Sequence, residues 1–493
     1  MQHSYAQLAQ RLKHDLQRQR HQAGDKLPSV RQLATSEGVS TATVVRCYRL
    51  LETEGYVEVR AKSGMYVADW KAQQAARRTL QAAADATTPP PVRFEQLASL
   101  QHRMSQLHAL TAQPLTLALH LADAEPGWYP CEALARAGQR LLRREPQGLG
   151  TYLTGTGLPA LKKALIGHLA RSGMDLGPAD LLVTSGATEA LQLALRAVTR
   201  PGDTIAVESP VYFGILQAGE LLGLKMLEIP CVAGQGMSLE ALEYALAQHG
   251  GVRAVVVMPN FQNPLGTAMP DAAKQRLLGL AERHGATLIE DDAFGDLAPG
   301  LDRPRPIKAW DRHGQVIYCG CASKSMAPAL RVGWVVGGRH QRTLESLKFS
   351  NSLTTPWFEQ AVLAEYMVSG AVAADLRRLR ERLAATVPPA TEAVRAHFPA
   401  GTRVAGPAIG WWLWIELPEG LDTMVLLHAA VRHGLAFTPG ALFSSAGKFK
   451  HHLRLNIARP WTRELALGIK TLGALAQAAA SHPAGAIAPA PSP

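Results

Sequence analysis

Four polar side chains, one of them a lysine that could do covalent chemistry, lie at or after the ends of apolar runs in the second half of the chain. Lys324 and Arg331 lie seven residues apart in SKSMAPALRVGW, after the run VIYCG. Asp291 ends the run TLIED, and Asn263 lies in PNFQNPLG. A lysine amine can attack a carbonyl carbon, a carboxylate can hold a cation, and a guanidinium can grip a phosphate or a carboxylate. These groups therefore predict a ligand that bears both a reactive carbonyl and an anion.

One cofactor explains the set, namely pyridoxal 5'-phosphate. Its aldehyde needs a lysine amine for a Schiff base, which Lys324 supplies, and its ring nitrogen needs a carboxylate, which Asp291 supplies. Arg331 would hold the phosphate, Asn263 would donate to the ring 3-oxygen, and Tyr212 in SPVYFG would stack on the ring. Taken singly, such a lysine is more often solvated, such an aspartate a cap and such a tyrosine core, so the prediction depends on the whole set.

Short strands must position these groups. Polar residues collect just past the carboxyl ends of parallel strands, where α/β sheets bind ligands. Gly186, Ala187 and Thr188 follow the first run and open a helix whose backbone N–H groups suit a phosphate, although most such turns are plain helix starts. Six continuous apolar runs are typical of a mostly parallel sheet covered on both faces, namely LLVTS (181–185), TIAVE (204–208), AVVVM (254–258), TLIED (287–291), VIYCG (316–320) and VGWVV (332–336).

The first 69 residues have a different pattern, of short helices followed by a hairpin. Apolar residues recur at helical spacing in YAQLAQRLKHDL, and Ser29 and Ser40 can each cap a following helix. Two helices joined by a short turn containing glycine are typical of a helix-turn-helix. GYVEVRAKSGMYVA then predicts two strands around the turn KSG, which together form a wing.

The last helix of this module would enter the major groove of double-stranded DNA, with its N-terminal turn toward the bases. Residues 1–80 carry 13 Lys and Arg against 7 Asp and Glu, a net +6 of the chain's +11, which favours a polyanionic partner. Each candidate contact alone is more often a solvated surface residue, so the ordered pattern carries the prediction. The candidates are Arg31, Ser40, Thr41, Thr43, Arg46, Lys62, Ser63 and Gly64.

The segments KLPSVRQLA, GVSTATV and LLETEGYVEVRAKSGMYVA resemble the GntR family of winged-helix regulators. The resemblance implies a DNA-binding domain across most of residues 1–69. The family usually has Arg directly after the Ser of the turn, where this chain has Thr41. One expected contact to a base or phosphate is therefore missing, and the operator of a relative cannot be transferred to this chain.

Residues from about 114 to 478 resemble a fold-type-I aminotransferase, and the whole chain resembles the MocR subgroup of GntR regulators. The motifs that carry this resemblance are GLGTYLTGTGLPALKKAL, TSGATEAL, SPVYFG, PNFQNPLGT, LIEDDAFGDL, ASKSMAPALRVGW and HLRLNIA. The resemblance implies pyridoxal 5'-phosphate held by Lys324, Asp291, Asn263, Tyr212, Arg331, Gly186, Ala187, Thr188 and Ser323.

The same resemblance implies two further roles. Arg454 would grip the α-carboxylate of an amino-acid ligand, and Tyr152 would reach the phosphate bound by a neighbouring subunit. From the residues alone, a structural salt bridge stays open as the alternative for Arg454. The resemblance also implies a head-to-tail, domain-swapped homodimer with shared sites.

The chain departs from the aminotransferase pattern at four positions. Phe294 stands where the family usually has Tyr, so no hydroxyl reaches the ring 3-oxygen from there, and Cys321 stands where a Ser often helps to hold the phosphate. Gly155 and Lys162 replace a common Pro and Arg. We expect a weaker grip on the cofactor without loss of binding.

The 493 residues are too many for one ordinary domain and, at 47% hydrophobic and 18% charged, fit globular material. We predict a multidomain chain that joins an α+β winged helix-turn-helix to an α/β aminotransferase-like domain. The predicted bounds are 1–69 for the DNA-binding domain, 70–113 for a linker with an amphipathic helix at about 94–107, 114–480 for the aminotransferase-like domain (large part about 145–345, smaller α+β part about 114–144 and 346–480) and 481–493 for a disordered tail.

Composition also excludes several classes of protein. No apolar run is long enough to span a bilayer, and the N-terminus lacks a hydrophobic signal core. The five cysteines show no paired spacing, which predicts reduced thiols in the cytoplasm and neither a disulfide framework nor a metal site.

Two functions fit these observations. In the first, a transcriptional regulator senses a small amine or amino acid by aldimine exchange at Lys324, and the ligand shifts how the protein binds its DNA operator. In the second, a functional aminotransferase acts on an amino acid, with Lys324 as proton shuttle and the DNA-binding domain as an appendage. The dedicated N-terminal domain favours the first, and residual transaminase activity is compatible with it.

Overall fold

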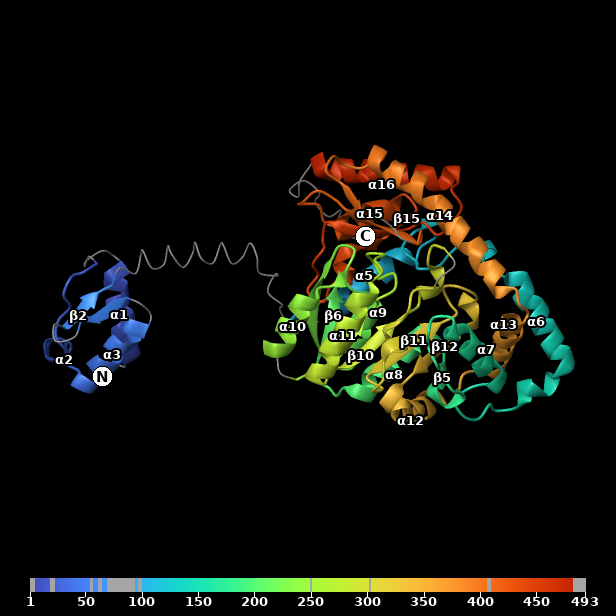
Figure 1. The fold of residues 1–493 in the computed structure, drawn as a ribbon. Helices are drawn as coiled ribbons and strands as arrows, with labels where there is room; N and C mark the ends of the chain where they lie inside the picture. Colours follow the sequence, from blue (N-terminus) through green and yellow to red (C-terminus); the bar gives the residue numbers. More distant parts are fainter. Residues whose placement is uncertain are drawn as a thin grey trace. The chain divides into compact units, whose positions relative to one another are not determined.

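The computed structural model divides the chain into two compact units, residues 1–90 and 91–493 (Figure 1). Each unit has its own hydrophobic core. Within the described residues, no helix combines the length and the apolar character that crossing a membrane requires. The structure describes residues 5–17, 23–53, 56–60, 64–68, 94–95, 100–248, 251–300, 303–405 and 409–481, so most of the predicted linker and tail lies outside the described residues.

The described residues of the first unit fold as three helices and a hairpin. Ser29 forms the predicted cap, because its Oγ accepts from the backbone N–H of Gln32 at 3.3 Å while Gln32 Oε1 accepts from the backbone N–H of Ser29 at 2.9 Å. Gly38 ends the second helix with a φ of 64°, a conformation that residues with side chains rarely adopt. The elements are α1 (Tyr5–Gln17), α2 (Val30–Glu37), α3 (Thr41–Thr53), β1 (Val57–Arg60) and β2 (Gly64–Val67).

The predicted wing is an antiparallel hairpin. Arg60 of β1 lies opposite Gly64 of β2. Gly64 is exposed and has a φ of 122°, so its backbone conformation favours glycine. Lys62 and Ser63 lie outside the described residues.

The second unit is built around a nine-stranded sheet of order β3-β7-β6-β9-β10-β11-β12-β5, with β8 paired to β7. The strands from β7 to β11 run parallel along this order, whereas β12 is antiparallel to both of its neighbours. All six predicted runs are strands. The bounds are β3 (Phe94–Glu95), β5 (Leu181–Thr184), β6 (Thr204–Ser209), β7 (Lys225–Val232), β8 (Gly236–Met237), β9 (Val252–Val257), β10 (Thr287–Asp291), β11 (Val316–Cys321) and β12 (Gly333–Val336).

Helices cover both faces of this sheet. Ile205 and Val207 of β6 pack in one core cluster with α8 and α9, whereas the intervening Ala206 packs in another cluster with α10 and α11. Burial on both faces explains why the strands read as continuous apolar runs. The helices of the large sheet are α7 (Pro159–Ala170), α8 (Gly186–Val198), α9 (Phe213–Leu221), α10 (Leu239–Gln248), α11 (Asp271–His284) and α12 (Gln341–Ser352).

A smaller antiparallel sheet of order β13-β14-β17-β16 forms the C-terminal part, where α14 packs against α16 and α16 against α15 (Figure 1). A short parallel pair, β4 with β15, joins an early segment of the unit to this part. The bounds are β4 (Leu117–Ala118), β13 (Arg403–Ala405), β14 (Trp412–Glu416), β15 (Leu435–Ala436), β16 (Thr438–Pro439), β17 (His452–Asn456), α14 (Val372–His397), α15 (Thr423–Arg432) and α16 (Arg463–Ser481).

The helix expected at about 94–107 begins later than predicted. Phe94 lies in β3, which pairs antiparallel to β7, and the helix is α5 (Leu100–Thr111). Leu100, Met104 and Leu107 are buried in the core of the second unit, as their common helical face predicts. Because pairing to a sheet edge needs extended backbone, the contact with β7 decides the start of this helix.

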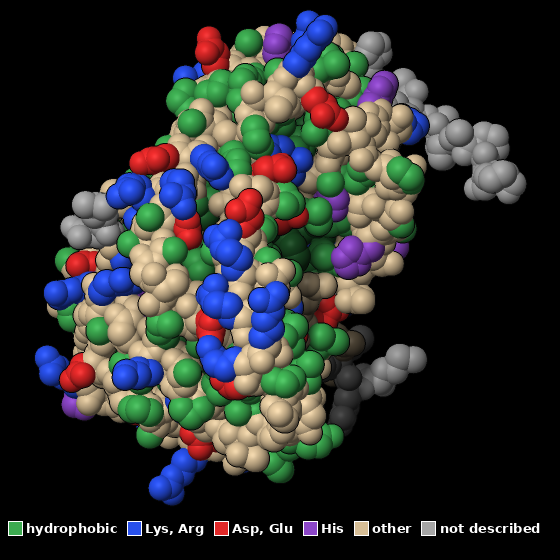
Figure 2. Space-filling model, turned by 90° about the vertical axis from the view of Figure 1, so that its right-hand side faces the viewer, with side chains coloured by type: hydrophobic (Ala, Val, Ile, Leu, Met, Phe, Trp, Pro, Cys, Tyr) green, Lys and Arg blue, Asp and Glu red, His purple; other side chains and the backbone are tan. Residues whose placement is uncertain are grey.

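Helices α6 (Cys131–Arg144) and α13 (Trp357–Val368), whose residues fall within the predicted bounds of the smaller part, pack against each other, and α13 also packs against α7. Basic side chains gather on the face that carries α6 and α14 (Figure 2). Several of them are paired with carboxylates, since Arg140 and Arg144 contact Glu365, and Arg378 contacts Asp375. Positive charge on this face therefore does not by itself indicate a nucleic-acid surface.

Candidate functional site

A cavity of about 550 Å³, including its mouth, opens beyond the carboxyl ends of the parallel strands and beside the start of α8. This is the edge at which α/β sheets bind ligands. Eight of the predicted cofactor residues line the cavity, namely Ala187, Thr188, Tyr212, Asn263, Asp291, Ser323, Lys324 and Arg331.

Lys324 lies in the turn after β11 and lines this cavity. Its Nζ donates to the carbonyl oxygen of Ala122 at 2.5 Å. Desolvation lowers the pKa of Lys324, and the positive charge of Arg454 lowers it further. A lowered pKa leaves more of the amine neutral, which is the form that attacks an aldehyde.

Asp291 ends β10 and is buried. Its Oδ1 accepts from the backbone N–H of Ala293 at 3.2 Å, yet desolvation raises the pKa of Asp291 to about 7. The neighbouring Asp292, in contrast, forms an ion pair with Arg303 at 2.7 Å. A protonated ring nitrogen would supply the cation that the Asp291 carboxylate needs in order to be ionised. Of the two adjacent aspartates, Asp291 therefore fits the pyridine ring.

Arg331 lines the cavity and packs against Gly186. Gly186 begins α8 with a φ of 80°, and a Cβ at this position would lie 2.4 Å from Nη2 of Arg331. Arg331 Nη1 donates to Ser323 Oγ at 2.9 Å, and Ala187 and Thr188 continue the lining. Backbone donors at a helix N-terminus together with a guanidinium suit a phosphate group, and only glycine leaves room for this arrangement.

Tyr212 and Asn263 also line the cavity. The ring of Tyr212 packs over Gly214, where a Cβ would lie 2.5 Å from the ring. Asn263 Oδ1 accepts from Arg454 Nη1 at 3.0 Å. With the amide oxygen engaged in this way, the amide NH2 of Asn263 is the group that can donate to a ligand.

The departures Phe294 and Cys321 lie at the site itself, since both line the cavity. The Phe294 ring centroid is 5.9 Å from Lys324 Nζ, and burial raises the pKa of the Cys321 thiol. Tyr152 is 80% exposed and does not line the cavity of its own chain. Its expected contact with a neighbouring subunit stays a prediction, because that contact requires a second copy of the chain.

Arg454 of β17 is buried between aromatic rings, with its Cζ 5.6 Å from the Trp412 ring centroid and 5.4 Å from that of Phe443. Besides Asn263, its guanidinium donates to the carbonyl oxygen of His120 at 2.9 Å. Its Nε is buried without a hydrogen-bond partner, and burial lowers the pKa of Arg454 to about 10. No carboxylate among the described residues forms an ion pair with it, so the salt-bridge alternative has no partner there.

Sequence reasoning missed the segment around residues 120–122. The backbone carbonyls of His120 and Ala122 hold the side chains of Arg454 and Lys324 respectively. A backbone carbonyl carries no side-chain signature, so no pattern in the sequence could have identified it.

In the first unit, the candidate DNA contacts lie on the surface at the start of α3 and on α2. Ser40 caps α3, because its Oγ accepts from the backbone N–H of Thr43 at 3.1 Å and also lies 2.8 Å from Thr43 Oγ1. Thr41 and Arg46 of α3 and Arg31 of α2 are exposed. These side chains are not packed in the core and can contact a DNA duplex. Ser40 and Thr43 also stabilise the N-terminal end of α3.

Comparison with known proteins agrees with both halves of this description. The family of bacterial regulatory proteins called gntR matches residues 4–67, and aminotransferase class I and II matches residues 120–472. The probable rhizopine catabolism regulatory protein MocR of Rhizobium meliloti is 30% identical over 444 residues, which cover 88% of this chain and 86% of that protein. The chain belongs to the MocR group of gntR-family regulators.

A second relative covers almost the whole chain. The uncharacterized HTH-type transcriptional regulator YdcR of Escherichia coli K12 is 34% identical over 473 residues, which are 96% of this chain and 99% of that protein. The order of the two modules is therefore shared along the full length.

Two solved structures similar to the aminotransferase-like part of this MocR-type chain contain forms of the cofactor. Pyrococcus horikoshii kynurenine aminotransferase in complex with PMP has a TM-score of 0.70 at 30% identity and covers 76% of this chain and 94% of its own. LysN, the α-aminoadipate aminotransferase of Thermus thermophilus, complexed with N-(5'-phosphopyridoxyl)-L-leucine, has a TM-score of 0.70 at 28% identity and covers 77% and 95%. Together with the family match, they imply pyridoxal phosphate as the cofactor.

Proposed function

We propose that this MocR-type protein is a transcriptional regulator that senses a small amine or amino acid by exchange, at Lys324, between the lysine amine and the amine of the effector. The observation that carries the proposal is that the amine of Lys324, with its pKa lowered by burial, lines one cavity with Asp291 and Arg331. When bound, pyridoxal phosphate supplies an aldehyde that amines can attack reversibly.

Each side chain of the site would have one task. Lys324 supplies the amine, Asp291 keeps a proton on the ring nitrogen, and Asn263 donates to the ring 3-oxygen. Tyr212 stacks on the ring. The phosphate would be held by Arg331, Ser323, Gly186, Ala187 and Thr188, and by Tyr152 from a neighbouring subunit of a domain-swapped homodimer.

Arg454 favours an effector that carries a carboxylate. A buried guanidinium whose Nε lacks a hydrogen-bond partner is costly, and a carboxylate can accept from it and neutralise its charge. Its contact with Asn263 links it to the cofactor cavity. An amino acid would therefore bind with its amine toward Lys324 and its carboxylate toward Arg454.

Helix α3 would read the operator in the major groove, with Thr41 and Arg46 toward the DNA. Arg31, Ser40 and Thr43, together with Lys62, Ser63 and Gly64 of the wing, would complete the contact. An effector can change DNA binding only if it binds two arrangements of the protein with different affinity. Such a regulator would work in the cytoplasm.

A functional aminotransferase is the second candidate. The same cavity keeps the groups that a half-reaction needs, because Lys324 could also move a proton at the α-carbon of a substrate. The N-terminal unit has no task in this alternative.

The two candidates separate in one experiment. The cofactor-loaded protein is mixed with a panel of amino acids and amines, and the visible absorbance of the cofactor and the affinity for duplexes selected from a random pool are measured together. A regulator changes both in response to one ligand class. Steady multiple turnover with a keto acid, without any binding of selected DNA, would reject the proposal.

A further inference from the structure

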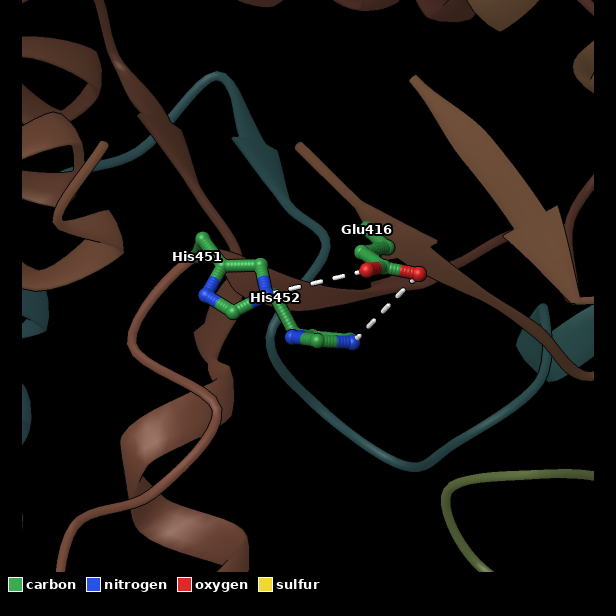
Figure 3. Close-up of side chains that lie close together, drawn as sticks. All are labelled: Glu416, His451 and His452. Atoms are coloured by element: carbon green, nitrogen blue, oxygen red, sulfur yellow. Dashed lines mark ion pairs between the residues drawn. The ribbon is translucent and has the colours of Figure 1, made fainter. Parts of the chain in front are cut away.

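Glu416, His451 and His452 form a cluster at the smaller sheet (Figure 3). None of the three lines the cofactor cavity. Glu416 ends β14 and lies directly opposite His452, the first residue of β17, while His451 precedes that strand. The Nε2 atom of His451 lies 3.7 Å from Glu416 Oε1, and that of His452 lies 3.9 Å from Oε2. One nitrogen or oxygen atom from each residue lies within 4.8 Å of the other two.

These separations are close to those around a bound transition-metal ion. Bonds of about 2.0–2.2 Å to imidazole nitrogen and carboxylate oxygen in tetrahedral geometry hold neighbouring ligand atoms about 3.4 Å apart. Small side-chain rotations would close the difference from the distances observed. Two imidazoles and one carboxylate suit zinc and chemically similar divalent ions, and leave further coordination positions to water or another ligand.

The surroundings hold one imidazole ready for such an ion. The His452 ring stacks on Trp414 with centroids 5.1 Å apart and meets the Phe449 ring edge-on at 5.5 Å. Its Nδ1 is buried without a hydrogen-bond partner. This packing fixes the orientation of the His452 ring, with its Nε2 toward Glu416.

Arg403 is the competitor for the carboxylate. Its Nε donates to Glu416 Oε2 at 2.9 Å, and its Nη2 contacts Oε1. The Arg403 side chain is 75% exposed, so it can withdraw into water when another cation takes its place. A metal ion and Arg403 would therefore compete for the Glu416 carboxylate.

We propose that Glu416, His451 and His452 bind a divalent transition-metal ion of the zinc type. The proposal does not depend on the function of the cofactor cavity. The site lies on the same face of β17 as Arg454, two residues away along the strand. The five cysteines take no part in it, which is why cysteine spacing did not predict it.

The test is a titration of the cofactor-loaded full chain, made without a histidine tag, with Zn²⁺ in competition with a chromogenic chelator. His451→Gln and Glu416→Gln should each weaken one class of binding by about tenfold or more. His428→Gln, which changes an exposed histidine of α15, is the matched control and should leave the titration unchanged. Binding to the exposed thiol of Cys131 is common to all of these proteins and cancels in the comparison.

Arg403→Gln distinguishes a metal site from a merely structural cluster. Removing the competing guanidinium should tighten Zn²⁺ binding severalfold, whereas loss of a structural ion pair would leave it unchanged or weaker. In the same proteins, Zn²⁺ should raise the midpoint of thermal unfolding of the wild type and of Arg403→Gln but not of His451→Gln. Equal titrations for the wild type and His451→Gln, or Zn²⁺ binding by Arg403→Gln that is no tighter than that of the wild type, would overturn the proposal.

Discussion

The two units of the chain place their candidate chemistry in opposite environments. Thr41 and Arg46 of the first unit face water, whereas Lys324 and Asp291 of the second line a cavity in which desolvation shifts both of their pKa values. Charges in water are screened by salt within about 10 Å at 0.1 M, while buried groups respond to burial and to their immediate neighbours. The affinity for DNA should therefore depend on the salt concentration and on the summed charge of the surface. The affinity for the cofactor should depend on the exact position of individual groups in the cavity.

The largest expected effect is the loss of cofactor attachment in a variant whose DNA binding is unchanged. Lys324→Ala removes the amine that joins the cofactor, so the visible absorbance band of the bound cofactor should disappear on titration with pyridoxal phosphate. Lys163→Ala, an exposed lysine of α7, is the control and should keep the band. A full band in Lys324→Ala would contradict the assignment, and affinity for unselected duplex should not change.

The pH dependence of stability tests the burial of Asp291. In cofactor-free protein, its pKa is about 7 when folded, against 3.8 for an unperturbed group. Its contribution to stability is therefore fully present below about pH 4 and is lost as the pH rises through 7. Asp291→Asn cannot ionise, so the free energy of unfolding of this variant should rise relative to that of the wild type by about 3 kcal/mol between pH 5 and pH 8.

Denaturant unfolding of both cofactor-free proteins at each pH measures this difference. Glu290, whose pKa burial raises to about 8, is present in both proteins, so its contribution cancels. A difference that stays flat across this range would show that Asp291 is well solvated or already paired.

The DNA-binding surface should respond to loss of charge. Replacing Arg31 and Arg46 together by Ala should lower the affinity for duplex DNA about a hundredfold and reduce the slope of log affinity against log salt by about 2, because two phosphate contacts are lost. Fluorescence anisotropy at several salt concentrations measures both quantities. Arg342→Ala, an exposed arginine of α12, serves as control. An unchanged slope of log affinity against log salt would show that the duplex binds a surface other than the one that carries Arg31 and Arg46.

A single methyl group tests the phosphate end of the cavity. Gly186→Ala puts a Cβ 2.4 Å from Arg331 Nη2 at a φ of 80°, so we expect cofactor affinity to fall about tenfold as the guanidinium is pushed aside. Gly202→Ala is the matched control, because Gly202 has a φ of 89° with open space around its Cβ. Equal losses of cofactor affinity in both variants would show that backbone strain alone, and not contact with Arg331, causes the loss.

The smallest effect concerns Phe294. Phe294→Tyr restores a hydroxyl beside the cofactor ring, and one added hydrogen bond of about 0.5–1.5 kcal/mol should tighten cofactor binding by a few fold. An absorbance titration compares the variant with the wild type. Weaker binding by Phe294→Tyr would mean that the packing of Phe294 against Trp412, at 4.9 Å between ring centroids, leaves no room for the oxygen.

The sequence by itself determined the six central strands and the residue types at their ends. Continuous apolar runs indicate burial on both faces. Asp291 is the last residue of its strand and Lys324 follows the end of the next strand, so the strand ends place both side chains. The caps at Ser29 and Ser40 were equally predictable, because a hydroxyl that caps a helix acts within three residues of itself.

Only the tertiary structure decided which distant groups meet. The carbonyl oxygen of Ala122 reaches Lys324 across 202 residues, and Arg454 reaches Asn263 across 191 residues. The same holds for Glu416 and His452, which the antiparallel register of β14 and β17 brings face to face. Local patterns record burial and periodicity, whereas contacts between separate strands depend on register and loop paths that no short segment encodes.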